Sequence, residues 1–116
     1  MNTIFHIANR QQWEQAKDLG SYRADSLDTE GFIHCSKSTQ IVKVANKFFF
    51  NQKELVLLLI DSDRVQAEIR YEEAERGELF PHIYGALNID AVYQVIDFEA
   101  GEDGFFELPQ EVINLE

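Results

Sequence analysis

The sequence ELVLLLID, residues 54–61, is apolar along almost its whole length and shows no alternation with polar side chains. Successive side chains of a strand point to opposite faces of a sheet, so a strand of this composition must be covered on both faces. We therefore expect residues 54–61 to form the central strand of the sheet, with the rest of the chain arranged around it.

Two elements are predicted at the start of the chain. TIFHIA, residues 3–8, is short, apolar and partly β-branched, which is typical of a strand. A helix over residues 10–19 follows, because Asn9 is suited to cap its first turn and Gly20 to end it. The expected buried side of this helix consists of Trp13, Ala16 and Leu19.

A second helix is predicted just before the central strand. Ser38 is a suitable N-cap for TQIVKVANKFFF, residues 39–50. Between the two helices, residues 21–31 have no clear period and are expected to form an ordered loop, and GFIHCS, residues 31–36, is expected to form a second strand. The apolar stripe of the second helix, at helical spacing, consists of Ile41, Val44, Ala45, Phe48 and Phe49.

The second half of the chain has more strands. Residues 65–73 predict a strand, and residues 75–87, ERGELFPHIYGAL, predict a turn followed by an extended segment. Pro81 removes one backbone donor, so we expect this segment to be an edge strand or a loop laid over the core. Residues 91–99 predict a last strand, in which Val92, Gln94, Ile96 and Phe98 alternate imperfectly.

These elements are strands along most of the chain, with helices before and after the second strand. A chain of 116 residues with 45% hydrophobic residues can bury one core, so we expect a single domain over residues 1–116, with residues 100–116 as a less regular tail. No apolar stretch approaches the roughly 20 residues of a membrane span. The single cysteine, Cys35, fits a reducing compartment. We therefore expect a cytoplasmic protein that does not bind membranes.

The net charge of −11 is unevenly distributed. Residues 1–60 carry seven Lys or Arg against six Asp or Glu, whereas residues 61–116 carry three against fifteen. This balance argues against nonspecific binding of nucleic acid, because a polyanion would be repelled by most of the surface. A small anionic ligand would have to be held by cations of the first half, which include Arg10, Arg23, Lys37, Lys43 and Lys47.

The pair His34 and Cys35 in GFIHCS suggests a thiolate nucleophile with its base, but the alternation of side chains argues against it. On a strand, His34 shares a face with Phe32 and Ser36, whereas Cys35 lies on the opposite face with Ile33. We therefore interpret Cys35 as a small buried apolar residue. The pair with chemical potential is His34 with Ser36.

The other two histidines also lie in apolar runs. Alternation places His6 with Ile4 and Ala8, and His82 with Phe80 and Tyr84. A buried imidazole needs partners for its ring nitrogens. One explanation is a shared polar cleft, and the other is three separate core histidines that bond to backbone carbonyls. The candidate lining of the cleft is His6, His34, Ser36, His82 and Tyr84.

Other catalytic patterns are weak or missing. No two histidines lie at the spacing of a local metal site, so local spacing does not support one, and our predicted site residues include no metal ligand. The sequence has no glycine-rich phosphate loop and no serine-hydrolase motif. The acidic run YEEAERGE, residues 71–78, offers Glu72 and Glu73 as candidate catalytic carboxylates, although a run of acids more often forms a solvated face.

Several linked segments resemble the DUF952 family, small bacterial and plant proteins of undefined function. They cover residues 3–97 and include SYRADSLDTEGFIHCS, LVLLLID and FPHIYGAL, in that order. The resemblance implies an α+β fold with two or three helices, similar to that of ADP-ribosyltransferases. In those enzymes a split β-sheet forms a cleft that holds NAD. It also implies that His6 contacts a ribose, and that Ser36 or His34 stands at the second motif. The glutamate of the third motif has no assigned counterpart, because His82 stands where we would look for it.

Our leading hypothesis is a cleft that binds a nucleotide or NAD-like ligand, with transferase or hydrolase activity. His34 and His82 are the candidates for proton transfer, with His6 and Ser36 beside them. We expect Tyr22 to contact ribose or nicotinamide, and Arg10, Arg23 or Lys37 to contact phosphate. Tyr84 is expected to line the cleft. Further hydrogen bonds to the ligand are expected from Ser26, Ser36 and Asn46.

Two alternatives remain open. The first is a noncatalytic module of the same fold that binds a protein partner through its acidic second half or the FPHIYG edge. The second is a metal-dependent hydrolase with His6, His34 and His82 as ligands.

Overall fold

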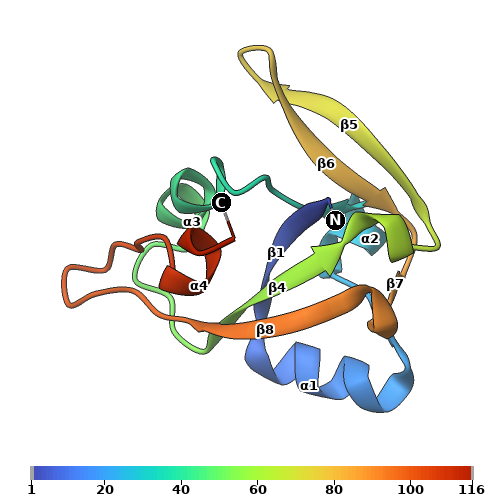
Figure 1. Cartoon of the computed structure of the whole chain (residues 1–116), viewed down its shortest axis with the longest axis horizontal. Helices are drawn as coiled ribbons and strands as arrows, with labels where there is room; N and C mark the ends of the chain where they lie inside the picture. The colour runs from blue at the N-terminus through green and yellow to red at the C-terminus, as the bar shows by residue number, and fades with distance from the viewer. Residues whose placement is uncertain (1, 116) are drawn as a thin grey trace.

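Strand β4 (Leu55–Asp61) lies between β1 (Thr3–Asn9) and β8 (Val92–Phe98) in a three-stranded antiparallel sheet, here called sheet A (Figure 1). This arrangement is that of the computed structural model, which describes residues 2–115. Every residue from Leu55 to Ile60 is buried. The prediction of a central strand covered on both faces is therefore confirmed.

The two faces of sheet A are covered by two hydrophobic cores. The first core contains alternate residues of β4 such as Leu58 and packs against α1 (Arg10–Leu19). The second core contains the intervening residues such as Leu57 and packs against α3 (Ile41–Phe48). The tail joins the second core, because the side chains of Phe106 and Val112 are buried in it.

The remaining elements make the fold α+β, as predicted. Residues 2–115 contain four α-helices, whereas two or three were expected. Two of the four are short and lack the periodic apolar pattern by which a helix is predicted. In chain order, the other elements are β2 (Ser21–Tyr22), α2 (Asp25–Thr29), β3 (Ile33–His34), a 3₁₀ turn (Ser62–Arg64), β5 (Glu68–Glu75), β6 (Glu78–Tyr84), β7 (Leu87–Asn88), a 3₁₀ turn (Ile89–Ala91) and α4 (Gln110–Ile113).

Helix α1 has the predicted ends. The side chain of Asn9 accepts a hydrogen bond from the backbone N–H of Gln12, and Gly20 ends the helix in the left-handed conformation with φ 89°. Trp13 is buried, but Leu19 is 81% exposed, so the prediction that Leu19 belongs to the buried side is wrong. Leu19 is the last residue of the helix, where the chain turns away from the core.

Helix α3 begins at Ile41 rather than after Ser38, and no side chain caps it. The turn before it is held by Gln40, whose Oε1 accepts a hydrogen bond from the backbone N–H of Lys37. Ile41 is buried in the second core, but Phe48 is 65% exposed. The prediction of a continuous buried stripe is therefore wrong at Phe48, whereas Phe49 is half-buried against the second core, as expected.

The segment 21–31 is not the loop that we predicted. Strand β2 pairs with β7, and helix α2 begins shortly after β2 ends. Strand β2 has only two residues and depends on a partner far along the chain. Helix α2 begins at Asp25, and its N-cap residue, Ala24, provides no side-chain cap. Neither element therefore has a local signal.

A second three-stranded sheet, here called sheet C, has the order β3–β6–β5. Strand β6 is its central strand, so the prediction of an edge strand for residues 78–84 is wrong. Pro81 is tolerated because β3 ends opposite it: the backbone N–H of Cys35 donates to the carbonyl of Pro81 at 3.0 Å. The one bond that Pro81 cannot donate falls just beyond the last ladder residue of β3, His34.

The segment GFIHCS joins the two sheets instead of forming one strand. Ile33 and His34 pair with β6, whereas Ser36 pairs with Phe5 of β1 through two backbone hydrogen bonds of 2.7 and 2.9 Å. The chain therefore passes from sheet C to sheet A within a few residues. Figure 1 shows that the hairpin of β5 and β6 projects from sheet A as a separate layer.

Strand β8 is an edge strand of sheet A, and its imperfect alternation has a structural cause. The register with β4 shifts between Leu59 and Ile60, so Tyr93 has no partner in the ladder.

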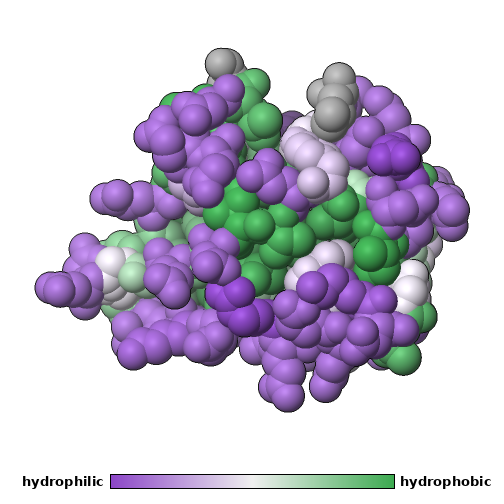
Figure 2. All heavy atoms as spheres, turned by 60° about the horizontal axis from the view of Figure 1, so that its bottom comes forward, coloured by the Kyte–Doolittle hydropathy of each residue, from purple (hydrophilic) through white to green (hydrophobic). Residues whose placement is uncertain are grey.

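The surface of the molecule is shown in Figure 2 from the side of α1. Hydrophobic residues gather in the middle of this view, with polar residues around them. Within residues 2–115, no helix is long and apolar enough to cross a membrane.

Candidate functional site

A cleft of about 490 Å³ lies between α3, strand β1 and the inner face of sheet C. It is the place where the two sheets separate around the segment 33–36. Its polar and charged lining consists of His6, Glu30, His34, Ser36, Lys43, Lys47 and His82. Its apolar lining consists of Phe5, Ile7, Cys35, Val44, Phe48, Phe49, Ala74 and Phe80.

His82 is held at this cleft by its position on the central strand of sheet C. Its Nδ1 lies 2.8 Å from Oε1 of Glu72, on the neighbouring strand β5. The side chain of His82 is only 7% exposed, and its Nε2 is the one buried side-chain nitrogen or oxygen without a hydrogen-bond partner in residues 2–115. A buried polar atom without a partner costs free energy, so this nitrogen is a candidate for contact with a ligand.

The carboxylate of Glu72 determines which nitrogen of His82 carries the proton. The hydroxyl of Tyr84 donates a hydrogen bond to Glu72 Oε1, the same oxygen that contacts His82. The bond from Tyr84, followed by that from His82, lowers the pKa of Glu72, which is therefore ionised and accepts from Nδ1–H. In the neutral ring, Nε2 consequently carries the lone pair.

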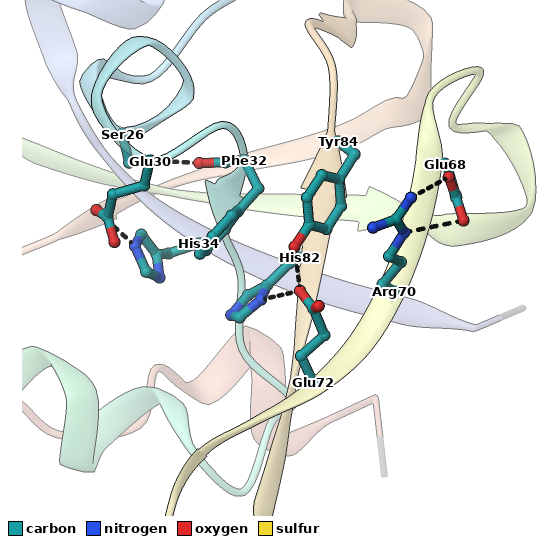
Figure 3. Close-up of polar contacts among 9 residues, drawn as sticks. All are labelled: Ser26, Glu30, Phe32, His34, Glu68, Arg70, Glu72, His82 and Tyr84. Atoms are coloured by element: carbon teal, nitrogen blue, oxygen red, sulfur yellow. Dashed lines mark hydrogen bonds and ion pairs between the residues drawn. The ribbon is translucent and has the colours of Figure 1, made fainter.

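Arg70 supports this group from its outer side. Its guanidinium lies 4.3 Å from the centre of the Tyr84 ring and is bonded to Glu68 at 3.0 and 3.1 Å. The hydrogen bond from Tyr84 to Glu72 raises the pKa of the Tyr84 phenol, so Tyr84 remains a donor. The positions of Arg70, Tyr84 and Glu72 on adjacent strands explain why these side chains meet (Figure 3).

His34 lies on the other side of His82. Its Nε2 is 3.0 Å from Oε2 of Glu30, and its side chain is 53% exposed. The two imidazole rings are in edge contact, with centroids 5.4 Å apart. The ring of Phe32 stacks on His82 at 4.1 Å and touches His34 at 4.8 Å, so it holds both rings in place (Figure 3).

His6 is buried, and both of its ring nitrogens have hydrogen-bond partners within the protein. Nδ1 lies 2.5 Å from the backbone carbonyl of His34, and Nε2 lies 2.8 Å from the hydroxyl of Tyr22. Burial lowers the pKa of His6 to about 4 and raises that of Tyr22. His6 therefore positions the backbone of His34 as a neutral ring.

The hypothesis of a metal held by three histidines does not agree with this geometry. His6 has no nitrogen left to bind a metal, because both are used by Tyr22 and His34. Within residues 2–115 there is also no group of three or more His, Cys, Asp or Glu side chains placed to hold a metal ion.

The predicted hydrogen-bonding groups lie in different places. Ser36 is buried and lines the cleft. Ser26 donates to the carbonyl of Phe32 at 2.8 Å, and thus supports the loop that carries the stacked ring. Asn46 uses both ends of its amide on the backbone of Phe106, at 2.7 and 3.4 Å, and anchors the tail.

The predicted phosphate-binding cations do not line the cleft. Arg10 is paired with Glu54 and Asp97, and Arg23 with Asp28. Lys37 is exposed in the turn before α3. The cations that do line the cleft are Lys43, which is paired with Glu78, and Lys47. Both are on α3.

The prediction for Cys35 is confirmed. The side chain is 3% exposed and belongs to the first core together with Ile33. Burial raises the pKa of the thiol, which therefore remains protonated and unreactive.

Glu30 and Arg70 were not among the predicted site residues, and Glu72 was only one of two acidic candidates. Phe32 was placed on the face of His34 but was given no role. Alternation along β5 was a usable signal for part of this set, because it puts Glu68, Arg70 and Glu72 on one face. The contact of that face with His82 depends on the pairing of β5 with β6, which no local pattern specifies.

Comparison with solved structures finds this fold in protein CC0527 from Caulobacter crescentus. Its crystal structure is 29% identical in sequence, superposes with a TM-score of 0.89, and the match covers 97% of this chain and 99% of that chain. Its solution NMR structure is 31% identical, with a TM-score of 0.82 and full coverage of both chains.

No curated protein matches the sequence. The family described as "Protein of unknown function (DUF952)" matches residues 7–95, which confirms the resemblance found in the sequence. The chain therefore belongs to the DUF952 family.

Proposed function

We propose that the cleft binds a nucleotide or NAD-like ligand and that His82 accepts a proton from a hydroxyl group, or from water, during transfer or hydrolysis. The observation that carries the proposal is the pair of His82 and Glu72. One nitrogen of His82 is bonded to an ionised carboxylate, and the other is buried without a partner beside the cleft. A carboxylate that orients a histidine in this way prepares it to act as a general base.

The lining of the cleft supports a ligand with an anionic part and a flat apolar part. Lys43 and Lys47 lie on one wall of a cleft in a chain of net charge −11. Phenylalanine rings such as Phe48 and Phe80 line the same cleft and offer surfaces on which a base can stack. Phosphate and nucleobase together match this combination better than a wholly apolar ligand does.

The proposal includes an ADP-ribosyltransferase-like fold for the split between sheets A and C. In that interpretation Glu72 supplies the carboxylate for which the sequence offered no assigned position, because it lies within hydrogen-bond distance of His82. The carboxylate would stabilise positive charge that develops on His82 or on the ligand. His6 would hold the backbone of His34 instead of contacting a ribose.

Replacing Glu72 with glutamine is expected to weaken ligand binding roughly 10- to 100-fold, because a hydrogen bond to a charged group is worth about 1.5–3 kcal/mol. We would titrate NAD, ADP-ribose and AMP into the protein and follow the histidine rings by NMR. In the unmodified protein, one of these ligands should shift the signals of His34 and His82 together. The variant should need a higher concentration of that ligand for the same shift.

The matched control is Glu73→Gln, which makes the same change on the next residue of β5, where the side chain is exposed on the opposite face. This variant should bind as the unmodified protein does. If none of the ligands shifts His82, the proposal fails. A noncatalytic module that binds proteins through its acidic second half would then be the better explanation.

A further inference from the structure

The site contains two histidines, and each has its own glutamate. His82 is bonded through Nδ1 to Glu72, and His34 through Nε2 to Glu30. Their rings are in edge contact, and both side chains line the same cleft. The nitrogens that remain for a ligand are therefore Nε2 of His82 and Nδ1 of His34.

The two rings differ in their exposure to water. The side chain of His82 is 7% exposed and is covered by Phe32, whereas that of His34 is 53% exposed. A charged ring is costly in the buried position and is readily solvated in the exposed one. The buried ring, with Nε2 unpartnered, is thus suited to accept a proton, and the exposed ring, held by Glu30, is suited to donate one from Nδ1.

We propose that His34 is the general acid of this site and that the substrate is a nucleotide phosphoester whose leaving group is an alcohol. The inference rests on the proposed function, in which His82 is the base. Nicotinamide leaves NAD as a neutral ring and needs no proton, so a proton donor beside the base would not assist the departure of nicotinamide. An alkoxide leaving group does need one.

The step balances in protons and bonds. His82 Nε2 takes the proton of the attacking hydroxyl, from water or from a neighbouring ribose hydroxyl, and that oxygen forms a bond to phosphorus. The bond between phosphorus and the leaving oxygen breaks, and His34 Nδ1–H gives its proton to that oxygen. Lys43 and Lys47 are the cations of the cleft that would offset the charge on the phosphate.

The test compares two substrates with the full chain and its His34→Gln variant. Uridylyl-adenosine has an alcohol leaving group, and the 4-nitrophenyl ester of uridine 3′-phosphate has a leaving group that departs without a proton. The variant should lose about 100-fold or more in rate on the dinucleotide and less than about 5-fold on the nitrophenyl ester, since a general acid contributes 10²- to 10⁴-fold. Glu30→Gln should show the same difference between the two substrates, with a smaller loss of rate on the dinucleotide.

Equal losses on the two substrates would assign His34 to positioning alone and overturn the proposal. So would the absence of cleavage of both esters by the unmodified protein. In that case the NMR titration of His82 separates the two ideas: a shift with nucleotides keeps the proposed function and rejects only the phosphoester. Asp28→Asn is the matched control for Glu30→Gln, because Asp28 lies on α2 and is paired with Arg23, outside the cleft.

Discussion

Replacing Leu58 with alanine is expected to lower the free energy of unfolding by about 3 kcal/mol. Leu58 is fully buried in the central strand of sheet A and belongs to the first core, between β1, β8 and α1. The substitution removes apolar contacts and leaves a cavity that a close-packed strand cannot close. Urea denaturation at neutral pH, with the free energy extrapolated to water, measures the loss.

The matched control is Leu19→Ala, the same change at an 81% exposed position on the last residue of α1. It should alter the free energy of unfolding by less than about 0.5 kcal/mol. Equal losses at Leu58 and Leu19 would contradict the assignment of β4 as the centre of the fold.

Lowering the pH from 7 to 4.5 is expected to reduce the free energy of unfolding by about 2.5 kcal/mol through His6 alone. Burial lowers the pKa of this ring from its ordinary value of 6.5 to about 4. Between these values the unfolded chain binds a proton that the folded chain does not bind. The stabilisation is thus fully present above pH 6.5 and is lost as the pH falls toward 4.

The test for His6 is the difference in unfolding free energy between pH 7 and pH 4.5, measured in the unmodified protein and in His6→Asn. The asparagine variant should lose less on acidification, by about 2.5 kcal/mol, because it has no ring to protonate. An NMR titration of the unmodified protein checks the same point without a variant. A ring of His6 that gains its charge near pH 6.5 would contradict the prediction.

The parts of the fold that could be predicted are those with local signals. The run LVLLLI identified β4 because no polar residue interrupts it, and Asn9 with Gly20 identified both ends of α1. Strands β2 and β3, of two residues each, carry no such signal, because their partners lie far along the chain. The central place of β6 was missed because Pro81 argues for an edge unless the end of β3 is known to lie opposite it.

The candidate site could likewise be predicted only where local alternation groups its residues, and not where distant strands pair. Alternation grouped His34 with Ser36, and His82 with Tyr84, and the structure brings His34 and His82 into contact. Alternation could not tell which neighbour His6 faces, since that depends on how β1 sits against β2. The role of Glu72 was likewise out of reach, because it follows from the pairing of β5 with β6.

The two lysines of the cleft belong to a chain whose net charge opposes the ligand they would attract. At long range an anionic ligand would be repelled by the acidic surface, and only at close range would it meet Lys43, which also contacts Glu78, and Lys47. Because salt shortens the reach of charges to about 8 Å at physiological ionic strength, added salt weakens the repulsion first. In the proposed function, such a ligand would therefore associate faster as salt is added, whereas its close contacts with the two lysines would be weakened less.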